Sequence, residues 1–287
     1  MVSFYFYMRM QDLPRQVPDT GSLKASLRDF ITPFADKNFQ PLLCYFIAGV
    51  FAQAFASAYY AAYALEVLKL PFTVITLYGA TQSFGVIVSS RFWSFVADRF
   101  GHKPTLAISA TLLAINPLIW ILGRPNDLAF NIALFLPAHV MFGFFWSGVG
   151  LTQFTLLINS APEANRSIYI GAGNALNSLV GGISPLLGGV VLVALEGHFP
   201  LQYSYQVLFA IVMVLRLFAP ILLSRVKEPG SANVRTAIGQ LTSARPAGVR
   251  ALRRLSKENN VKAREEAIDE IREEGLVLAG DALVKAL

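Results

Sequence analysis

The polar side chains that could do chemistry in this chain lie on two helical faces inside long apolar stretches. Residues spaced by i, i+4 and i+7 project from the same side of a helix. That spacing relates Gln53, Ser57 and Tyr60 in one stretch, and His139, Trp146 and Gln153 in another. Such faces could bind a polar or aromatic solute by hydrogen bonds and stacking. They could equally hold helices together, because Gln and Tyr within a membrane often satisfy one another.

His139 is the strongest single candidate for a functional group. An ionisable side chain is expensive to bury in a membrane, so its presence there indicates a use. None of the apolar stretches contains an Asp or Glu far from its ends, so a carboxylate proton relay has no support in this chain. Protonation of His139 is the only coupling chemistry that the sequence predicts.

The chain that must position these residues is too apolar for an ordinary soluble domain. It has 287 residues, of which 54% are hydrophobic and only 15% are charged, whereas soluble domains are about one quarter charged. A helix needs about 20 apolar residues to cross the membrane, and apolar runs without alternation exclude barrel strands. The sequence therefore predicts an all-α integral membrane protein with six transmembrane helices, at about 41–64, 71–95, 104–122, 129–157, 168–194 and 201–224.

Lysine and arginine residues gather on one side of these predicted helices, and the other side carries only Lys69 and Arg124. Because basic residues are retained in the cytoplasm, we expect a multi-pass protein of the cell membrane with both termini cytoplasmic. The expected organisation is a cytoplasmic linker, a six-helix membrane domain and an amphipathic helical tail, at 1–40, 41–225 and 226–287. Attraction to the lipid bilayer explains the net charge of +6 without nucleic acid.

The loop between the second and third predicted helices carries a motif, Ser94-Phe-Val-Ala-Asp-Arg-Phe-Gly-His-Lys-Pro104. This signature loop (residues 94–104) resembles the sequence Gly-x-x-x-Asp-Arg-x-Gly-Arg-Arg of the major facilitator superfamily (MFS). Its departures are Ser94 and His102, which stand where the family has Gly and a basic residue.

Four residues of the signature loop are candidates for a conformational gate. Gly101 permits a tight turn, while Arg99 and Lys103 hold the loop in the cytoplasm. The resemblance implies that Asp98 faces the positive N-terminus of another helix, as a latch that opens when a transporter changes state.

The fifth predicted helix contains Gly181-Gly-Ile-Ser-Pro-Leu-Leu-Gly-Gly189, which resembles the family's Gly-Pro-x-x-Gly-Gly segment. Glycines let helices approach closely, and a proline removes one backbone hydrogen bond, so the helix suits a rocking motion. Static packing of small residues is the alternative. The candidates for gating contacts on this helix are Asn174, Asn177, Pro185, Gly188 and Gly189.

The resemblance covers roughly 38–228 and includes the run Pro162-Glu-Ala-Asn-Arg-Ser167, in which Arg166 is a further candidate for the conformational gate. It implies one C-terminal half of an MFS fold, built as a 3+3 inverted repeat. In that fold the first and fourth helices line the central cavity, which makes Gln53, Tyr60, His139, Trp146 and Gln153 cavity candidates. The sixth helix is peripheral in the family, so we expect Arg216 to be structural, either snorkelling or pairing within the protein.

The predicted function is alternating-access transport of a small solute, by a half-transporter or a truncated C-terminal half. Activity would need a second six-helix half, either a copy of this chain or a separate N-terminal half; the sequence indicates no substrate, direction or coupling ion. The alternative is a membrane-anchored scaffold that presents the tail at 231–287 to a cytoplasmic partner. Enzyme motifs such as a phosphate-binding loop or His-Glu-x-x-His are missing, so we expect no catalysis, cofactor or metal.

Overall fold

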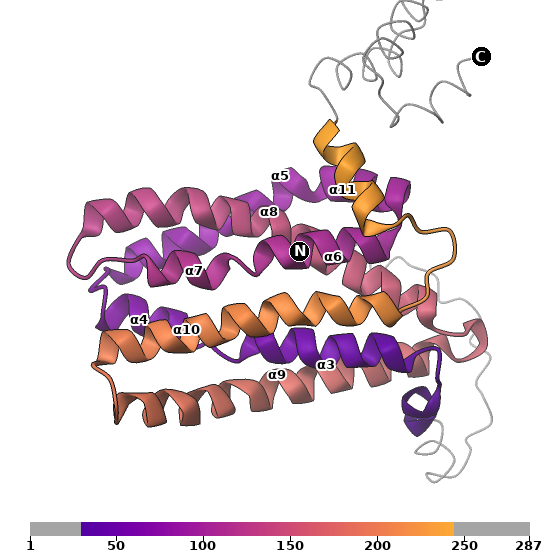
Figure 1. The fold of residues 1–287 in the computed structure, drawn as a ribbon, viewed down its shortest axis with the longest axis horizontal. Helices are drawn as coiled ribbons and strands as arrows, with labels where there is room; N and C mark the ends of the chain where they lie inside the picture. The colour runs from indigo at the N-terminus through magenta and orange to yellow at the C-terminus, as the bar shows by residue number, and fades with distance from the viewer. Residues whose placement is uncertain (1–29, 244–287) are drawn as a thin grey trace, which may run out of the picture.

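The computed structural model describes residues 30–243 and folds them into a bundle of antiparallel helices (Figure 1). Among the described residues, six helical segments are long and apolar enough to cross a membrane: Gln40–Glu66, Phe72–Phe100, His102–Ile121, Leu128–Ser160, Glu163–Glu196 and Leu201–Arg225. They coincide with the six predicted helices. Both ends of the described chain lie at the same end of the bundle as the signature loop, which we call the signature end.

The first span is interrupted where the sequence predicted one continuous helix. Helix α3 (Gln40–Ala54) ends in a turn over residues 55–58, and α4 (Tyr59–Glu66) completes the span. The backbone amide and the hydroxyl of Ser57 both donate to the carbonyl of Ala54, at 3.0 and 2.9 Å. A serine hydroxyl that bonds to nearby backbone competes with the helix. The break leaves the carbonyl of Gln53 available to another donor.

The second and fourth spans, α5 (Phe72–Phe100) and α8 (Leu128–Ser160), are long uninterrupted helices that pack tightly on each other. Glycines make this approach possible, because a Cβ added at Gly143 would collide with the carbonyl oxygen of Gln82. The third span divides into α6 (His102–Leu113) and α7 (Asn116–Ile121). Pro117 stands at the start of α7, where its missing amide costs least.

The fifth span consists of the short η1 (Glu163–Asn165) and α9 (Arg166–Glu196), which runs through Pro185 as a single helix. The sixth span is α10 (Leu201–Phe218) followed by the tighter η2 (Ala219–Arg225). Helix α11 (Val234–Ser243) then lies at the signature end beside α6 (Figure 1). This helix falls within the first part of the predicted tail. The rest of that tail and residues 1–29 of the predicted linker lie outside the described residues.

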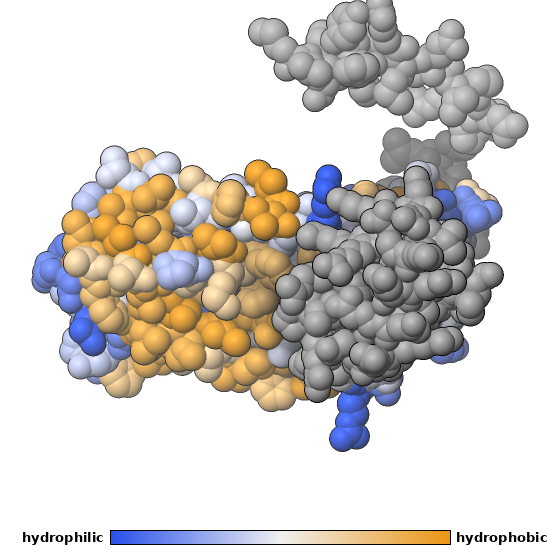
Figure 2. Space-filling model, turned by 90° about the horizontal axis from the view of Figure 1, so that it is seen from above, coloured by the Kyte–Doolittle hydropathy of each residue, from blue (hydrophilic) through white to orange (hydrophobic). Residues whose placement is uncertain are grey.

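The spans pack mainly as two groups, the first with the fifth and sixth and the second with the third and fourth. The first span, through α3, packs mainly on α9 and η2 of the last two spans, and α8 of the fourth span packs on α5 and α6. The outer faces of α5 and α9 expose large apolar side chains such as Phe84, Ile87, Leu186 and Val190. Figure 2 shows apolar residues across the middle of the molecule and hydrophilic ones at the end opposite the signature end. This surface suits a hydrocarbon layer.

Candidate functional site

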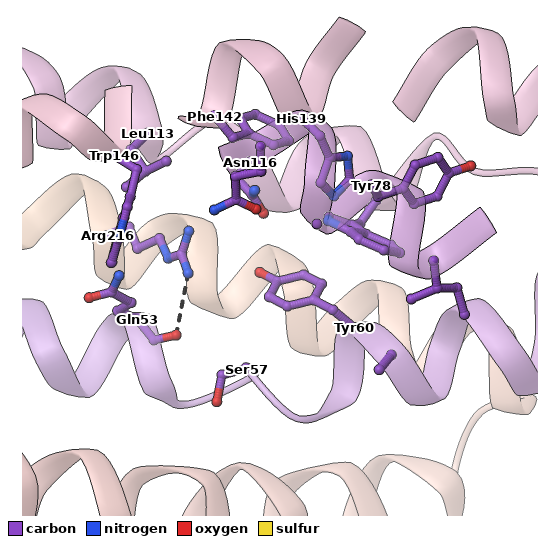
Figure 3. Close-up of a pocket in the computed structure, with 15 residues that line it drawn as sticks. Gln53, Ser57, Tyr60, Tyr78, Leu113, Asn116, His139, Phe142, Trp146 and Arg216 are labelled. Carbon is purple, nitrogen blue, oxygen red and sulfur yellow. Dashed lines mark hydrogen bonds between the residues drawn. The ribbon is translucent and has the colours of Figure 1, made fainter. Parts of the chain in front are cut away.

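A cavity of about 360 Å³ opens between the spans (Figure 3). Pockets for small molecules have volumes of about 300–1,000 Å³. Its rim carries exposed small residues, Ser57, Ala61 and Gly79. The first, second, third, fourth and sixth spans all contribute to its wall, with the polar and aromatic members Gln53, Ser57, Tyr60, Tyr78, Gln82, Asn116, Trp120, His139, Phe142, Trp146 and Arg216.

The structure brings four of the five predicted cavity residues together. Gln53, Tyr60, His139 and Trp146 all line the cavity, although the helix break separates Gln53 from Tyr60. Gln153 does not line it. Seven residues beyond Trp146 on the unbroken helix α8, it stands about 10 Å further along the axis.

Gln153 lines two smaller pockets instead. One of about 40 Å³ adjoins the cavity and shares Gln53, Trp146 and Arg216 with it. The other, of about 250 Å³, contains Asn174 and Asn177 and shares no residue with the cavity. Contrary to the prediction, Gln153 therefore does not line the cavity and lies just beyond it along α8.

His139 is nearly buried, with 6% of its surface exposed, and its ring is held from two sides. The ring stacks on Tyr78 at 4.9 Å and meets Trp120 edge-on at 5.7 Å. Its Nδ1 lies 2.8 Å from the carbonyl oxygen of Phe135. Because a carbonyl can only accept, this contact places a proton on Nδ1 and leaves Nε2 as the ring nitrogen for another partner.

Tyr60 has a fixed ring and an unused hydroxyl. The ring stacks on Phe209 at 4.6 Å and packs against Trp120 at 5.2 Å. Its hydroxyl is buried and forms no hydrogen bond with another described residue. Buried polar atoms normally find a partner, so an unused hydroxyl in the wall of a cavity is available to a bound molecule.

Arg216 lines the cavity, whereas the sequence predicted a structural role for it. One guanidinium nitrogen, Nη2, donates to the carbonyl oxygen of Gln53 at 3.3 Å, which is the carbonyl freed by the helix break. Its Nε is buried without a partner among the described residues. An arginine within a membrane span costs about 2.5–3.5 kcal/mol on insertion scales, which makes Arg216 a candidate functional residue.

The cavity wall also includes Tyr78, Asn116 and Trp120, which the sequence did not predict there. Asn116 was detectable, because it is a polar residue beside Pro117 in the middle of an apolar span. The two aromatic residues carried no such signal, since Tyr and Trp are ordinary members of apolar helices.

The fifth span contacts the first at its break. The hydroxyl of Tyr59 donates to the carbonyl of Pro185 at 2.8 Å, which satisfies a backbone group in the glycine-rich segment. A Cβ at Gly188 would collide with the carbonyl oxygen of Phe55, and one at Gly189 with the Tyr59 hydroxyl. Three of the five residues expected to make gating contacts therefore lie against the broken part of the first span.

Asn174 and Asn177 lie elsewhere on α9. Asn174 is exposed, and Asn177 has a buried side-chain oxygen without a partner in the described part of the chain. Neither residue lines the cavity of about 360 Å³.

The signature loop is tied to the segment that follows the sixth span. The carboxylate of Glu228 accepts hydrogen bonds from the backbone amides of His102 at 2.9 Å and Lys103 at 2.8 Å, which are the first residues of α6. A carboxylate at this position satisfies free amides and the positive end of the helix. Gly101, with φ of +97°, lies so close that a Cβ there would stand 2.6 Å from the Cβ of Ser231.

Asp98 is exposed at the end of α5 and forms no hydrogen bond or ion pair with another residue in 30–243. The helix N-terminus nearest in sequence, that of α6, is already occupied by Glu228. Arg166, expected with the same gate, begins α9 and forms an exposed pair with Glu163 at 3.9 Å. Such a surface pair contributes little to stability.

Within the described residues, no group of three metal-ligating side chains could hold a metal ion.

Comparisons with known proteins point to one family. A family model described as Major Facilitator Superfamily matches residues 17–268. A hexuronate transporter from Bacillus subtilis (strain 168) is 25% identical over 208 residues, which cover 71% of this chain and 46% of that protein. The chain thus spans about half the length of this curated relative. No solved structure gives a significant match.

Proposed function

Since the chain belongs to the major facilitator superfamily, and is thus a multi-pass membrane protein of a solute-transporter family, we propose that its cavity binds the transported solute. The observation that carries this proposal is the set of unused polar groups in the cavity wall, above all the Tyr60 hydroxyl. Aromatic rings from Tyr78, Trp120 and Trp146 supply flat apolar surface beside them. A solute that carries both ring-like and polar surface fits this combination.

The transport step in this proposal is alternating access against a second six-helix half. Two features support packing against a second half. The cavity rim includes exposed small residues, and a Cβ added at Gly171 or Gly182 of α9 would meet no atom within 4 Å beyond the backbone of its own helix. Small residues at a membrane helix surface favour close packing with another helix. The second half would be another copy of this chain or a separate chain segment.

The proposed orientation places the signature end in the cytoplasm of a cell-membrane protein. The signature end carries Arg99, Lys103, Arg166, Arg225 and Lys227, and the opposite end carries Lys69 and Arg124. This asymmetry is the basis of the proposal, because basic loops are retained on the cytoplasmic side.

Solute uptake into vesicles tests the function directly. The full chain would be reconstituted into lipid vesicles, and entry of radiolabelled solutes would be measured with protein-free vesicles as the control. The name of the Bacillus subtilis relative makes a hexuronate the first solute to assay, and glucose serves as its uncharged counterpart. We expect saturable uptake of at least one of them.

The assembly state must be measured on the same preparation, by mass determination in detergent. Saturable uptake by an assembly of twelve or more spans supports the proposal. A chain that stays monomeric and moves no solute in the panel contradicts it.

A further inference from the structure

We propose that Arg216 binds the carboxylate group of an organic anion, which makes organic anions the solute class of the cavity. The inference rests on the proposed function, because it takes the cavity as the solute site. It assigns to Arg216 a role in substrate selection, in place of the structural role expected from the position of its helix.

The guanidinium is held in place by the backbone and not by an acid. Its contact with the Gln53 carbonyl joins residues 163 positions apart in the sequence and uses a backbone acceptor that the break in the first span creates. A guanidinium has five N–H donors. Among the described residues this is its one hydrogen-bonded partner, so several donors remain for a ligand.

The positive charge has no counterion in the described part of the chain. No Asp or Glu lines the cavity, and Arg216 forms no ion pair with residues 30–243. Arginine keeps its charge when buried, and an unpaired charge away from water is costly. A bound anion would remove that cost, whereas a cation would be repelled and a neutral solute would leave the charge uncompensated.

Other donors lie where a carboxylate on Arg216 could meet them. In Figure 3 the Tyr60 hydroxyl points toward the guanidinium, and the amide of Asn116 lies across the cavity from Gln53. A hydrogen bond from a phenol or amide to a carboxylate is charge-assisted and therefore strong. Trp146 lies beside the guanidinium in Figure 3, and the Trp120 ring lies 5.7 Å from the His139 ring. Both line the cavity and offer apolar surface to the rest of the anion.

Matched pairs of charged and uncharged probes test the inference. The full chain in detergent would be titrated with glucuronate against glucose and with benzoate against benzyl alcohol. Tryptophan fluorescence would report binding, because Trp120 and Trp146, two of the three tryptophans, line the cavity. For at least one pair we expect the wild-type protein to bind the anion about 10- to 100-fold more tightly than its neutral analogue.

Three substitutions give the comparison. Arg216→Gln removes the charge and should abolish the preference for the anion. Arg216→Lys keeps the charge but loses the planar guanidinium that can bind both carboxylate oxygens, so it should retain part of the preference. Arg225→Gln removes an exposed arginine from the end of the same span and should leave the preference unchanged. Melting temperatures of all three variants would show that they are folded.

The outcomes separate this inference from the proposed transport. Anion preference that depends on Arg216, without uptake into vesicles, supports the binding site and counts against transport. Uptake of a neutral solute that survives Arg216→Gln supports transport and overturns the anion site. If Arg216 instead pairs with an acid of a second half, Arg216→Gln will lower the melting temperature without changing the anion-to-neutral ratio, which also overturns it. Failure of both anions to bind at millimolar concentration would also overturn the anion site.

Discussion

Glu228 and Lys103 form reciprocal contacts between the start of α6 and the segment that follows the sixth span. The carboxylate of Glu228 accepts the Lys103 backbone amide at 2.8 Å, and the Lys103 ammonium group reaches back to the carbonyl of Val226 at 2.7 Å. The acidic Glu228 thus lies at the N-terminus of α6, and the basic Lys103 lies at the C-terminal end of the sixth span. Both placements oppose the charge of a helix end. The signature loop is therefore anchored inside this half of the fold.

Removing this anchor should lower stability. Glu228→Ala leaves two backbone amides of α6 without their acceptor, and we expect a loss of about 1–2 kcal/mol, read as a lower melting temperature in detergent. Glu163→Ala is the control, because Glu163 is exposed and its pair with Arg166 is long. Equal effects of the two substitutions would contradict the capping role of Glu228.

Gly101 should be intolerant of a side chain for two separable reasons. Its φ of +97° disfavours any L-residue, and an added Cβ would press on Ser231. Gly230, with φ of +82° and open space around it, shares only the first reason. We expect Gly101→Ala to cost about 2–4 kcal/mol and Gly230→Ala about 1–2 kcal/mol. Thermal unfolding of both variants measures the difference, and the absence of a difference would mean that Ser231 can move away.

Two glycines of α9 should respond differently to an added methyl group. Gly188→Ala places a methyl group against the carbonyl of Phe55, so we expect destabilisation of about 1–3 kcal/mol. Gly182→Ala, six residues earlier on the same helix, meets open space and should leave the stability of the isolated chain unchanged. Melting temperatures in detergent check both. Similar losses at the two sites would contradict the close approach of α9 to the break in the first span.

Tyr60→Phe should affect solute binding without harming the fold. The substitution removes a hydroxyl that has no partner among the described residues and keeps the stacked ring. We expect about a 10-fold loss of solute affinity with an unchanged melting temperature. Tyr63→Phe is the matched control, because Tyr63 lies on the same helix but does not line the cavity. Unchanged affinity in Tyr60→Phe would place the solute elsewhere.

Asp98→Asn should leave the isolated chain as stable as before, because Asp98 is exposed and has no partner in residues 30–243. If Asp98 faces a helix of a second half, as the family resemblance implies, the substitution should instead weaken assembly and change the uptake rate. Detergent mass measurements and vesicle uptake on the same variant test this. Wild-type assembly and uptake in Asp98→Asn would remove the latch from the mechanism.

Much of the architecture could be predicted, because the length of an apolar stretch alone decides whether it crosses a membrane. The six spans, the loop with Asp98 and the polar faces on the first and fourth helices all follow from local patterns. The break at residues 55–58 was missed because a serine inside an apolar helix gives no reliable signal of a turn.

The sequence by itself determined that residues 30–243 contain six membrane spans and that the chain belongs to the major facilitator superfamily, since hydrophobic length and a loop motif are local properties. Only the tertiary structure decided which polar groups share a cavity. It excluded Gln153, because an unbroken helix carries that residue past the cavity, and it included Arg216, because packing sets α10 beside the break in the first span. Contacts between residues this far apart depend on how whole helices pack, which no local pattern encodes.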